Sequence, residues 1–234
     1  MAKLVWDEVG KRFYETGVSK CVLYLQDKEG KYPKGVSWSG ITAITESPSG
    51  AEATDIYADN IKYATLRSAE LLGATIEAYM SPDEWDQCDG MAEPVKGVKV
   101  GQQSRTSFGL CYRTEVGNDT STEEDDGYKL HFIYGATASP SEKGYQTINE
   151  SPEALSFSWE LSTTPVNVEG YKATSSMTIS SLEIDEASLA ALEAIIYGSE
   201  DTEARLPLPD EIIATIKGNT PVETKVNIED TPQG

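Results

Sequence analysis

The sequence has few of the residues that build metal and catalytic sites. It contains one histidine, His131, and three cysteines, Cys21, Cys88 and Cys111, with no CxxC spacing. A zinc site with the usual four ligands therefore has little support, and we expect free thiols in a reducing compartment. A phosphate-binding loop, a nucleophile elbow, an HExxH motif and an internal repeat are also absent from the sequence. We therefore expect no catalytic site, no bound metal and no cofactor.

Long apolar runs and basic residues are scarce as well. No stretch approaches the roughly 20 apolar residues that a membrane span needs, and Asp7 and Glu8 precede any apolar run that could form a signal peptide. The 19 basic residues against 39 acidic ones give a formal net charge of -20. This charge opposes binding to nucleic-acid phosphates and anionic lipids, but it suits a surface past which DNA must slide. We expect a cytoplasmic protein, unless it leaves the cell within a larger assembly.

Length and composition favour one domain with much polar surface. The chain has 234 residues, of which 38% are hydrophobic and 25% charged, and all-β domains commonly reach this size as one unit. We predict a single domain over residues 1–218, in which residues 1–20 form an N-terminal arm or a short docked strand. Residues 219–234 are predicted to be a polar C-terminal tail.

The clearest pattern lies in residues 154–166, where apolar and polar residues alternate. Successive side chains of a strand point to opposite faces, so this stretch predicts a strand with one core face and one polar face. Regular pairing should end or bulge at Pro165, which has no backbone N–H. The apolar row is Leu155, Phe157, Trp159 and Leu161.

Residues 185–197 predict the one longer helix, with Asp185 as its cap and Gly198 after its end. Ser81 begins a short helix signature, and residues 46–59, which are small and polar, predict a long surface loop. The other expected elements are a hairpin of residues 21–25 and 36–45, strands 61–67 and 72–80, a connection over 93–97, strands 108–112 and 128–134 joined by an acidic tip at 118–127, a strand within 168–184 with a bulge near 180–181, and a short apolar segment at 212–216.

These patterns predict a mainly β fold. We expect an antiparallel β-sandwich or barrel-like architecture with one flanking α-helix and long loops. Such a fold has edge strands, which must be protected or paired with another chain.

Three groups could carry chemistry, and each has a simpler interpretation. His131 has no accompanying nucleophile motif, so a hydrogen-bonded or exposed structural histidine is expected. The acidic run 123–126 could bind calcium, but its spacing does not match an EF-hand loop, and a solvated hairpin tip is favoured. Glu77 and Glu160 could form an acid–base pair, although charged side chains are mostly exposed at the surface.

Seven stretches carry a family resemblance: Gly35–Thr42, Thr45–Ala53, Tyr57–Tyr63, Gly73–Tyr79, Phe108–Leu110, Ala138–Lys143 and Phe157–Val166. In these residues the chain resembles the major tail tube proteins of long, non-contractile bacteriophage tails. The resemblance covers most of the chain, from about Gly35 to Ile216. These stretches are family signatures and not mechanistic motifs.

The resemblance implies a structural protein with no catalytic activity. Six copies would form a ring, and rings would stack into a hollow tube through which phage DNA passes without specific binding. Other tail proteins, such as the tape measure and the tail terminator, would be partners, and the protein would be assembled in the bacterial host cytoplasm and end in the virion tail. Head-to-tail contacts between rings do not close on themselves, so they build a filament.

Within that family, the resemblance assigns two sets of residues. The first set is a loop expected at the contact between rings, and the alternative is that this loop is a disordered surface loop. The loop comprises Glu46, Ser47, Pro48, Ser49, Gly50, Ala51 and Glu52. The second set is a candidate lumen-facing group on strand positions, for which the outer wall of the tube is the alternative. It comprises Glu77, Ser158 and Glu160.

Two further functions stay open. A carbohydrate-binding β-sandwich would use Trp6, Trp38 or Trp85 as stacking platforms, but Trp38 lies inside a strand pattern, where core packing is favoured. A hydrolase with paired carboxylates is supported only by the abundance of acidic residues.

Overall fold

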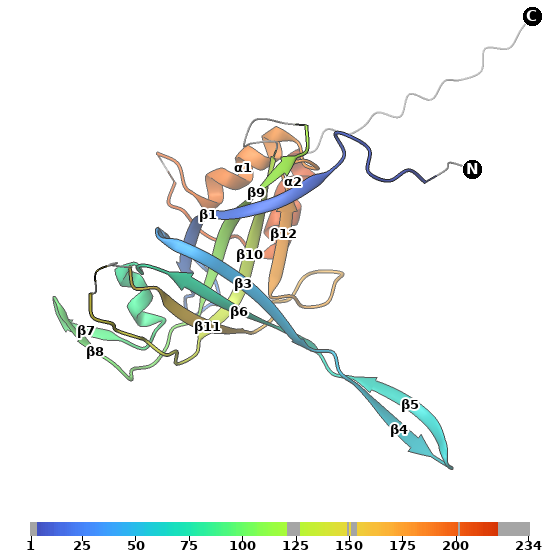
Figure 1. The fold of residues 1–234 in the computed structure, drawn as a ribbon, viewed down its shortest axis with the longest axis horizontal. Helices are drawn as coiled ribbons and strands as arrows, with labels where there is room; N and C mark the ends of the chain where they lie inside the picture. The colour runs from blue at the N-terminus through green and yellow to red at the C-terminus, as the bar shows by residue number, and fades with distance from the viewer. Residues whose placement is uncertain (1–3, 121–126, 149, 151–153, 201, 220–234) are drawn as a thin grey trace, which may run out of the picture.

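The computed structural model describes residues 4–120, 127–148, 150, 154–200 and 202–219. It shows a mainly β protein with antiparallel sheets, as the sequence predicts (Figure 1). One expectation was wrong, because two α-helices and not one flank the sheet. The elements are β1 Phe13–Leu25, β2 Gly35–Ser37, β3 Ile41–Gly50, β4 Ala53–Ala58, β5 Ile61–Arg67, β6 Glu70–Ala78, the 3-10 helix η1 Asp83–Gln87, β7 Ala92–Val95, β8 Val98–Val100, β9 Phe108–Asn118, β10 Gly127–Ala138, β11 Phe157–Thr163, β12 Ser176–Ser180, α1 Glu186–Ile196 and α2 Pro209–Asn219.

One large sheet forms the body, with the strand order β2-β1-β9-β10-β11-β6-β3, and β12 pairs with β10 beside it. The sheet bends at Gly135, which has a φ of +59°. Before this glycine β10 pairs with β9 and β12, and after it β10 pairs with β11 through Ala136–Ala138. The bend brings β3, β6 and β11 over β1 and β9, which gives a sandwich-like core without closing a barrel in the described part of the chain.

Three tryptophans fill the space between the two halves of the bent sheet. Trp38, Trp85 and Trp159 are buried, and their ring centroids lie 4.6 to 5.7 Å apart. Offset and edge-on contacts at such distances are favourable beyond the area that they bury. Trp159 and Leu161 of β11 point into this core and Phe157 packs at its edge, so the predicted apolar row is confirmed for these three residues.

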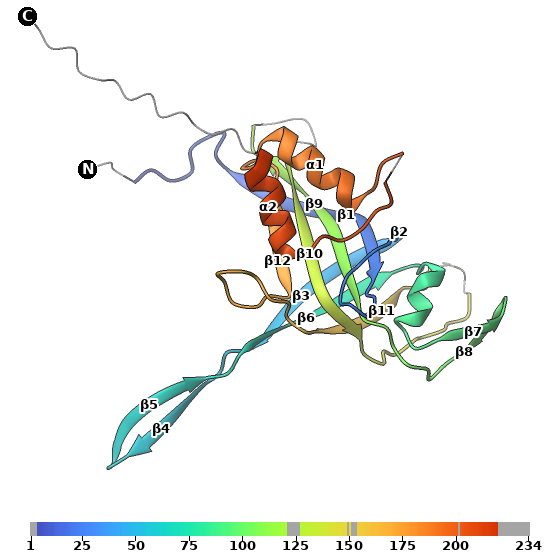
Figure 2. The same ribbon diagram turned by 180° about the vertical axis from the view of Figure 1, so that it is seen from behind.

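The two α-helices cover the other face of the sheet (Figure 2). The predicted helix is confirmed as α1, where the Asp185 side chain accepts a hydrogen bond from Ser188 N at 2.9 Å and Gly198 follows with a φ of +80°. Buried residues of α1, including Leu192 and Ile196, pack with aromatic residues of β1 and β10. The segment 212–216 belongs to the second helix, α2, which was expected only as a short apolar segment.

The predicted loop over residues 46–59 is the largest error. Residues 46–50 continue β3 and pair with β6, with Pro48 opposite Leu72, and residues 53–58 form β4. Small polar residues have a weak strand propensity of their own, but the neighbouring strand supplies hydrogen bonds that hold them extended. Figure 1 shows the result, a long two-stranded projection that leaves the body at its lower right.

Several smaller boundaries also differ from the prediction. Residues 13–20 extend β1 by pairing with β9, so among the described residues of the predicted arm only 4–12 remain outside the sheet; residues 1–3 lie outside the described residues. The predicted strand 36–45 is split by Gly40 into β2 and β3. The predicted connection over 93–97 lies in the β7–β8 hairpin. The 3-10 helix η1 begins after Pro82, and the Ser81 side chain does not cap it. β12 ends at Ser180 in a turn and has no bulge there. The acidic run 123–126 and residues 220–234 of the tail lie outside the described residues.

Candidate assembly surfaces

The three residues predicted to face a lumen lie on one exposed face of the sheet. Ser158 of β11 is directly opposite Glu77 of β6, and Glu160 is opposite Thr75, so these side chains share a face. All three predicted residues are exposed, whereas Trp159 between them is buried on the other face. The register partners on this face are small or hydroxyl residues with no basic residue among them: Ala43, Thr45, Thr75 and Ser162.

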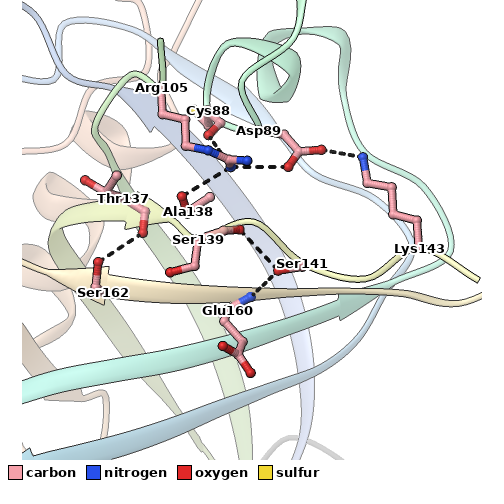
Figure 3. Close-up of polar contacts among 10 residues, drawn as sticks. All are labelled: Cys88, Asp89, Arg105, Thr137, Ala138, Ser139, Ser141, Lys143, Glu160 and Ser162. Carbon is pink, nitrogen blue, oxygen red and sulfur yellow. Dashed lines mark hydrogen bonds and ion pairs between the residues drawn. The ribbon is translucent and has the colours of Figure 1, made fainter. Parts of the chain in front are cut away.

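Backbone contacts hold β11 in place and leave the Glu160 carboxylate free. Ser139 N donates to Glu160 O at 2.7 Å. Glu160 N donates to Ser141 Oγ at 3.0 Å (Figure 3). In Figure 3 the carboxylate of Glu160 points away from this network, and none of the drawn contacts reaches it. The charge of Glu160 is therefore presented to whatever this face meets.

A buried carboxylate secures the segment next to this face. The Asp89 side chain is only 8% exposed and forms ion pairs with Arg105 Nη1, at 3.4 Å, and with Lys143 Nζ (Figure 3). Arg105 also donates to the backbone oxygens of Cys88 and Ala138. A charge buried with two charged partners is costly to leave alone, so this cluster ties three separate segments together.

The residues predicted for ring contact divide between β3 and the root of the projection. Glu46 to Gly50 belong to β3, and the Glu46 carboxylate accepts a hydrogen bond from Tyr112 Oη at 2.8 Å. Burial, together with this contact, raises the pKa of Tyr112. Ala51 and Glu52 form the junction to β4, where Gly50 and Ala51 have φ values of +87° and +56°. The seven residues are thus contiguous strand and junction, and not a free loop.

The ribbon, which we define as β4 and β5, has two different faces. Direct partners across a hairpin share a face. Asp55 lies opposite Thr65 and receives a hydrogen bond from Thr65 Oγ1 at 2.7 Å, while Lys62 Nζ is 2.7 Å from the same carboxylate. The opposite face is apolar apart from one threonine, and it comprises Thr54, Ile56, Ala58, Ile61, Ala64 and Leu66.

No described part of the chain covers the apolar face of the ribbon. Ile61 is 65% exposed and Leu66 58% exposed, and β4 and β5 pair only with each other among the described strands. An isolated two-stranded hairpin is marginally stable in water at best. The sequence held a signal for this hairpin that was missed, because Asp59 and Asn60 tolerate the positive φ values, 51° and 63°, of a tight two-residue turn.

The remaining candidate groups have structural surroundings. His131 Nε2 is 2.9 Å from Thr114 Oγ1 and 3.2 Å from Glu15 Oε1, and its ring stacks on Tyr112, so the hydrogen-bonded histidine is confirmed. The three cysteines are free and buried, and burial raises the pKa of Cys21 to about 12. In the described ranges no group of three or more His, Cys, Asp or Glu side chains could hold a metal ion.

The surroundings of the tryptophans and carboxylates bear on the two other functions. Trp38 and Trp85 are buried in the core, so of the three proposed sugar platforms only Trp6 is exposed. Glu77 and Glu160 do come to the same face, but both are exposed and neither has the desolvated surroundings that a general-acid carboxyl group uses.

Within the described residues, no helix is long and apolar enough to cross a membrane.

The fold thus defines a mainly β protein with a sandwich-like core, an open acidic sheet face and a protruding amphipathic ribbon. A comparison with known families finds no family model that matches the chain, and a search of curated proteins finds no significant match.

Proposed function

We propose that this protein is a structural subunit that assembles with copies of itself into stacked rings, the tail tube of a long, non-contractile phage tail. The observation that carries the proposal is the ribbon, whose apolar face has no partner among the described residues. An exposed apolar surface of this kind is typical of a site that binds another protein. The family resemblance of the sequence adds the kind of assembly.

Two further features support a ring that encloses DNA. β3 is a ten-residue edge strand, paired only with β6 among the described strands, and a strand from the next copy could pair with its free edge. The face with Glu77 and Glu160 presents carboxylates and no basic residue at the paired positions. Repulsion between such a face and DNA phosphates would let the DNA slide, because tight binding to DNA depends on basic residues that release counterions.

In this function the protein has no catalytic role and needs no cofactor. Other tail proteins, such as the tape measure and the tail terminator, would be its partners, and assembly would take place in the bacterial cytoplasm. The number of six copies per ring comes from the family resemblance.

Negative-stain microscopy of concentrated purified protein tests the proposal. We expect hollow rings or tubes of uniform diameter. The variant Ile61→Asp puts a charge on the apolar face of the ribbon and should leave folded protein that does not form tubes. Val95→Asp is the matched control, because Val95 is also 65% exposed but lies in the β7–β8 hairpin, on the other side of the body from the ribbon (Figure 1).

The outcomes separate the candidate functions. A strict monomer of the unmodified protein at high concentration would refute the tube. Binding to a glycan array that is lost in Trp6→Ala would favour the carbohydrate-binding alternative, because Trp6 is the remaining exposed platform.

A further inference from the structure

The described chain has further exposed apolar segments besides the ribbon. One of them is the arm, residues 4–12, in which Leu4, Val5, Trp6 and Val9 are 64% to 76% exposed. The arm is nevertheless attached to the body, because Gly10 N donates to Asp119 Oδ1 and Asn118 Nδ2 donates to Gly10 O, both at 2.9 Å. Its apolar side chains are therefore held out from the end of β9 in a limited region of space.

The arm and the ribbon leave the body at different ends. In Figures 1 and 2 the arm starts beside the last residues of β9, whereas the ribbon leaves at the opposite end of the body, beyond β3 and β6. Neither pairs with any other strand of the described sheets. Within one chain, each surface is thus too far from the other to cover it.

The arm and the ribbon each carry balanced charge. The chain carries a net charge of -20, so two copies repel one another over most of their surfaces. The ribbon, however, contains two acidic residues, Asp55 and Asp59, and two basic residues, Lys62 and Arg67. The arm has the same balance, with Asp7 and Glu8 against Lys11 and Arg12. These segments can therefore approach each other in two acidic copies without net repulsion.

We infer that the apolar face of the ribbon of one copy docks on the arm of the next copy. This inference rests on the proposed function and names the surface that receives the ribbon in the neighbouring ring. The flat aliphatic face formed by Ile56, Ile61 and Leu66 would pack against Trp6 and its apolar neighbours. Because the two contacting surfaces differ and lie at different ends of the molecule, the contact is head-to-tail and extends into a filament instead of closing into a dimer.

Crosslinking between engineered cysteines tests the inference, since the three natural cysteines are buried and a new surface thiol is the reactive one. Trp6→Cys protein and Ile61→Cys protein are prepared separately, mixed and treated with a short bismaleimide. We expect a crosslinked pair that contains one chain of each kind. Ile56→Cys replaces Ile61→Cys in a second mixture, so that the result does not depend on one alignment of the two surfaces.

Controls distinguish the other ways of covering the two surfaces. Trp6→Cys mixed with Val95→Cys should give at least tenfold less crosslinked pair, because Val95 is as exposed as Ile61 but lies in the β7–β8 hairpin, away from the ribbon (Figure 1). Trp6→Cys crosslinked to itself would mean an arm–arm contact, and Ile61→Cys crosslinked to itself a ribbon–ribbon contact. Either result, without the mixed pair, would overturn the inference.

Microscopy of the same samples separates this inference from the proposed function. Uniform tubes without a mixed crosslink at either ribbon position would leave the tube in place and refute the ribbon–arm contact. A mixed crosslink in filaments that are not hollow would keep the contact and refute the tube. Both the contact and the tube would be refuted if the unmodified protein stayed monomeric and the cysteine variants gave no crosslinked pair.

Discussion

Gly135 is the residue at which the sheet bends, and replacing it by alanine should be strongly destabilising. Its φ of +59° lies in the left-handed region, and a Cβ atom at this position would be in hard contact with the carbonyl oxygen of Thr164. The same backbone is fixed on both sides, since Thr164 N donates to Gly135 O at 2.9 Å and Gly135 N donates to Tyr32 Oη at 2.8 Å. The backbone therefore has little freedom to move away from the added methyl group.

Two costs add in Gly135→Ala. A residue with a Cβ atom loses roughly 1 kcal/mol in the left-handed conformation, and forcing extra volume into a packed site costs typically about 1–3 kcal/mol. The clash is with main-chain atoms, so no change of rotamer relieves it. We expect the free energy of unfolding to fall by about 2–4 kcal/mol, which is a large share of the stability of a typical domain.

Two glycines of the same chain separate these costs. Gly17 has a φ of +66° but no atom within 4 Å of the place that an added methyl group would take, so Gly17→Ala should cost roughly 1 kcal/mol from conformation alone. Gly144 has neither a positive φ nor a close neighbour, and Gly144→Ala should be neutral or stabilise by about 0.5 kcal/mol through the unfolded chain.

Urea unfolding at low protein concentration, where assembly does not contribute, measures all three variants. The midpoint should fall most for Gly135→Ala, with the slope unchanged. If Gly135→Ala and Gly17→Ala lowered the free energy of unfolding equally, the close contact with Thr164 would not restrain the backbone at Gly135. The sheet would then not depend on glycine at its bend.

Three further predictions use the same and related assays. Asp89→Asn removes a buried charge that holds two cations, and should lower the free energy of unfolding by about 1.5–3 kcal/mol in urea titrations; a loss below about 0.5 kcal/mol would show that the cluster does not tie its segments together. The hydrogen bond from Lys129, followed by that from Thr114, lowers the pKa of Glu15, so its stabilising contribution is present above the unfolded pKa of about 4.3 and is lost as pH falls through the lower folded value. Glu15→Gln should thus be less stable than the unmodified protein at pH 7 and equally stable at pH 2; an equal difference at both pH values would contradict this. Glu160→Lys should give tubes of normal diameter that release DNA more slowly, and unchanged release would place Glu160 outside the DNA path.

The alternation in β11 and the signals of α1 were readable from the sequence because they are local. Phe157, Trp159 and Leu161 take every second position, and a strand with this pattern can bury only one face whatever it pairs with. Asp185 and Gly198 mark the ends of α1 by satisfying backbone groups within a few residues. These elements needed no knowledge of distant residues.

The projection was not predictable in the same way, because residues far along the chain decide its conformation. Ser47 to Gly50 have little strand preference, and β6 supplies their partners, from Gly73 for Ser47 to Glu70 for Gly50. The apolar face of the ribbon also depends on pairing. The irregularity between Ile56 and Tyr57 shifts the register, and this shift puts Ile61 on the same face as Ile56.

The sequence by itself determined the mainly β class, the apolar row of β11, the helix α1 and the strong acidity that opposes binding to DNA. Only the tertiary structure decided that Glu77, Ser158 and Glu160 share one exposed face, and that residues 53–67 stand out from the body with an uncovered apolar face. The physical reason is that side-chain direction is a local property of a strand, whereas the face that meets solvent is set by which distant strands pair and where the sheet bends.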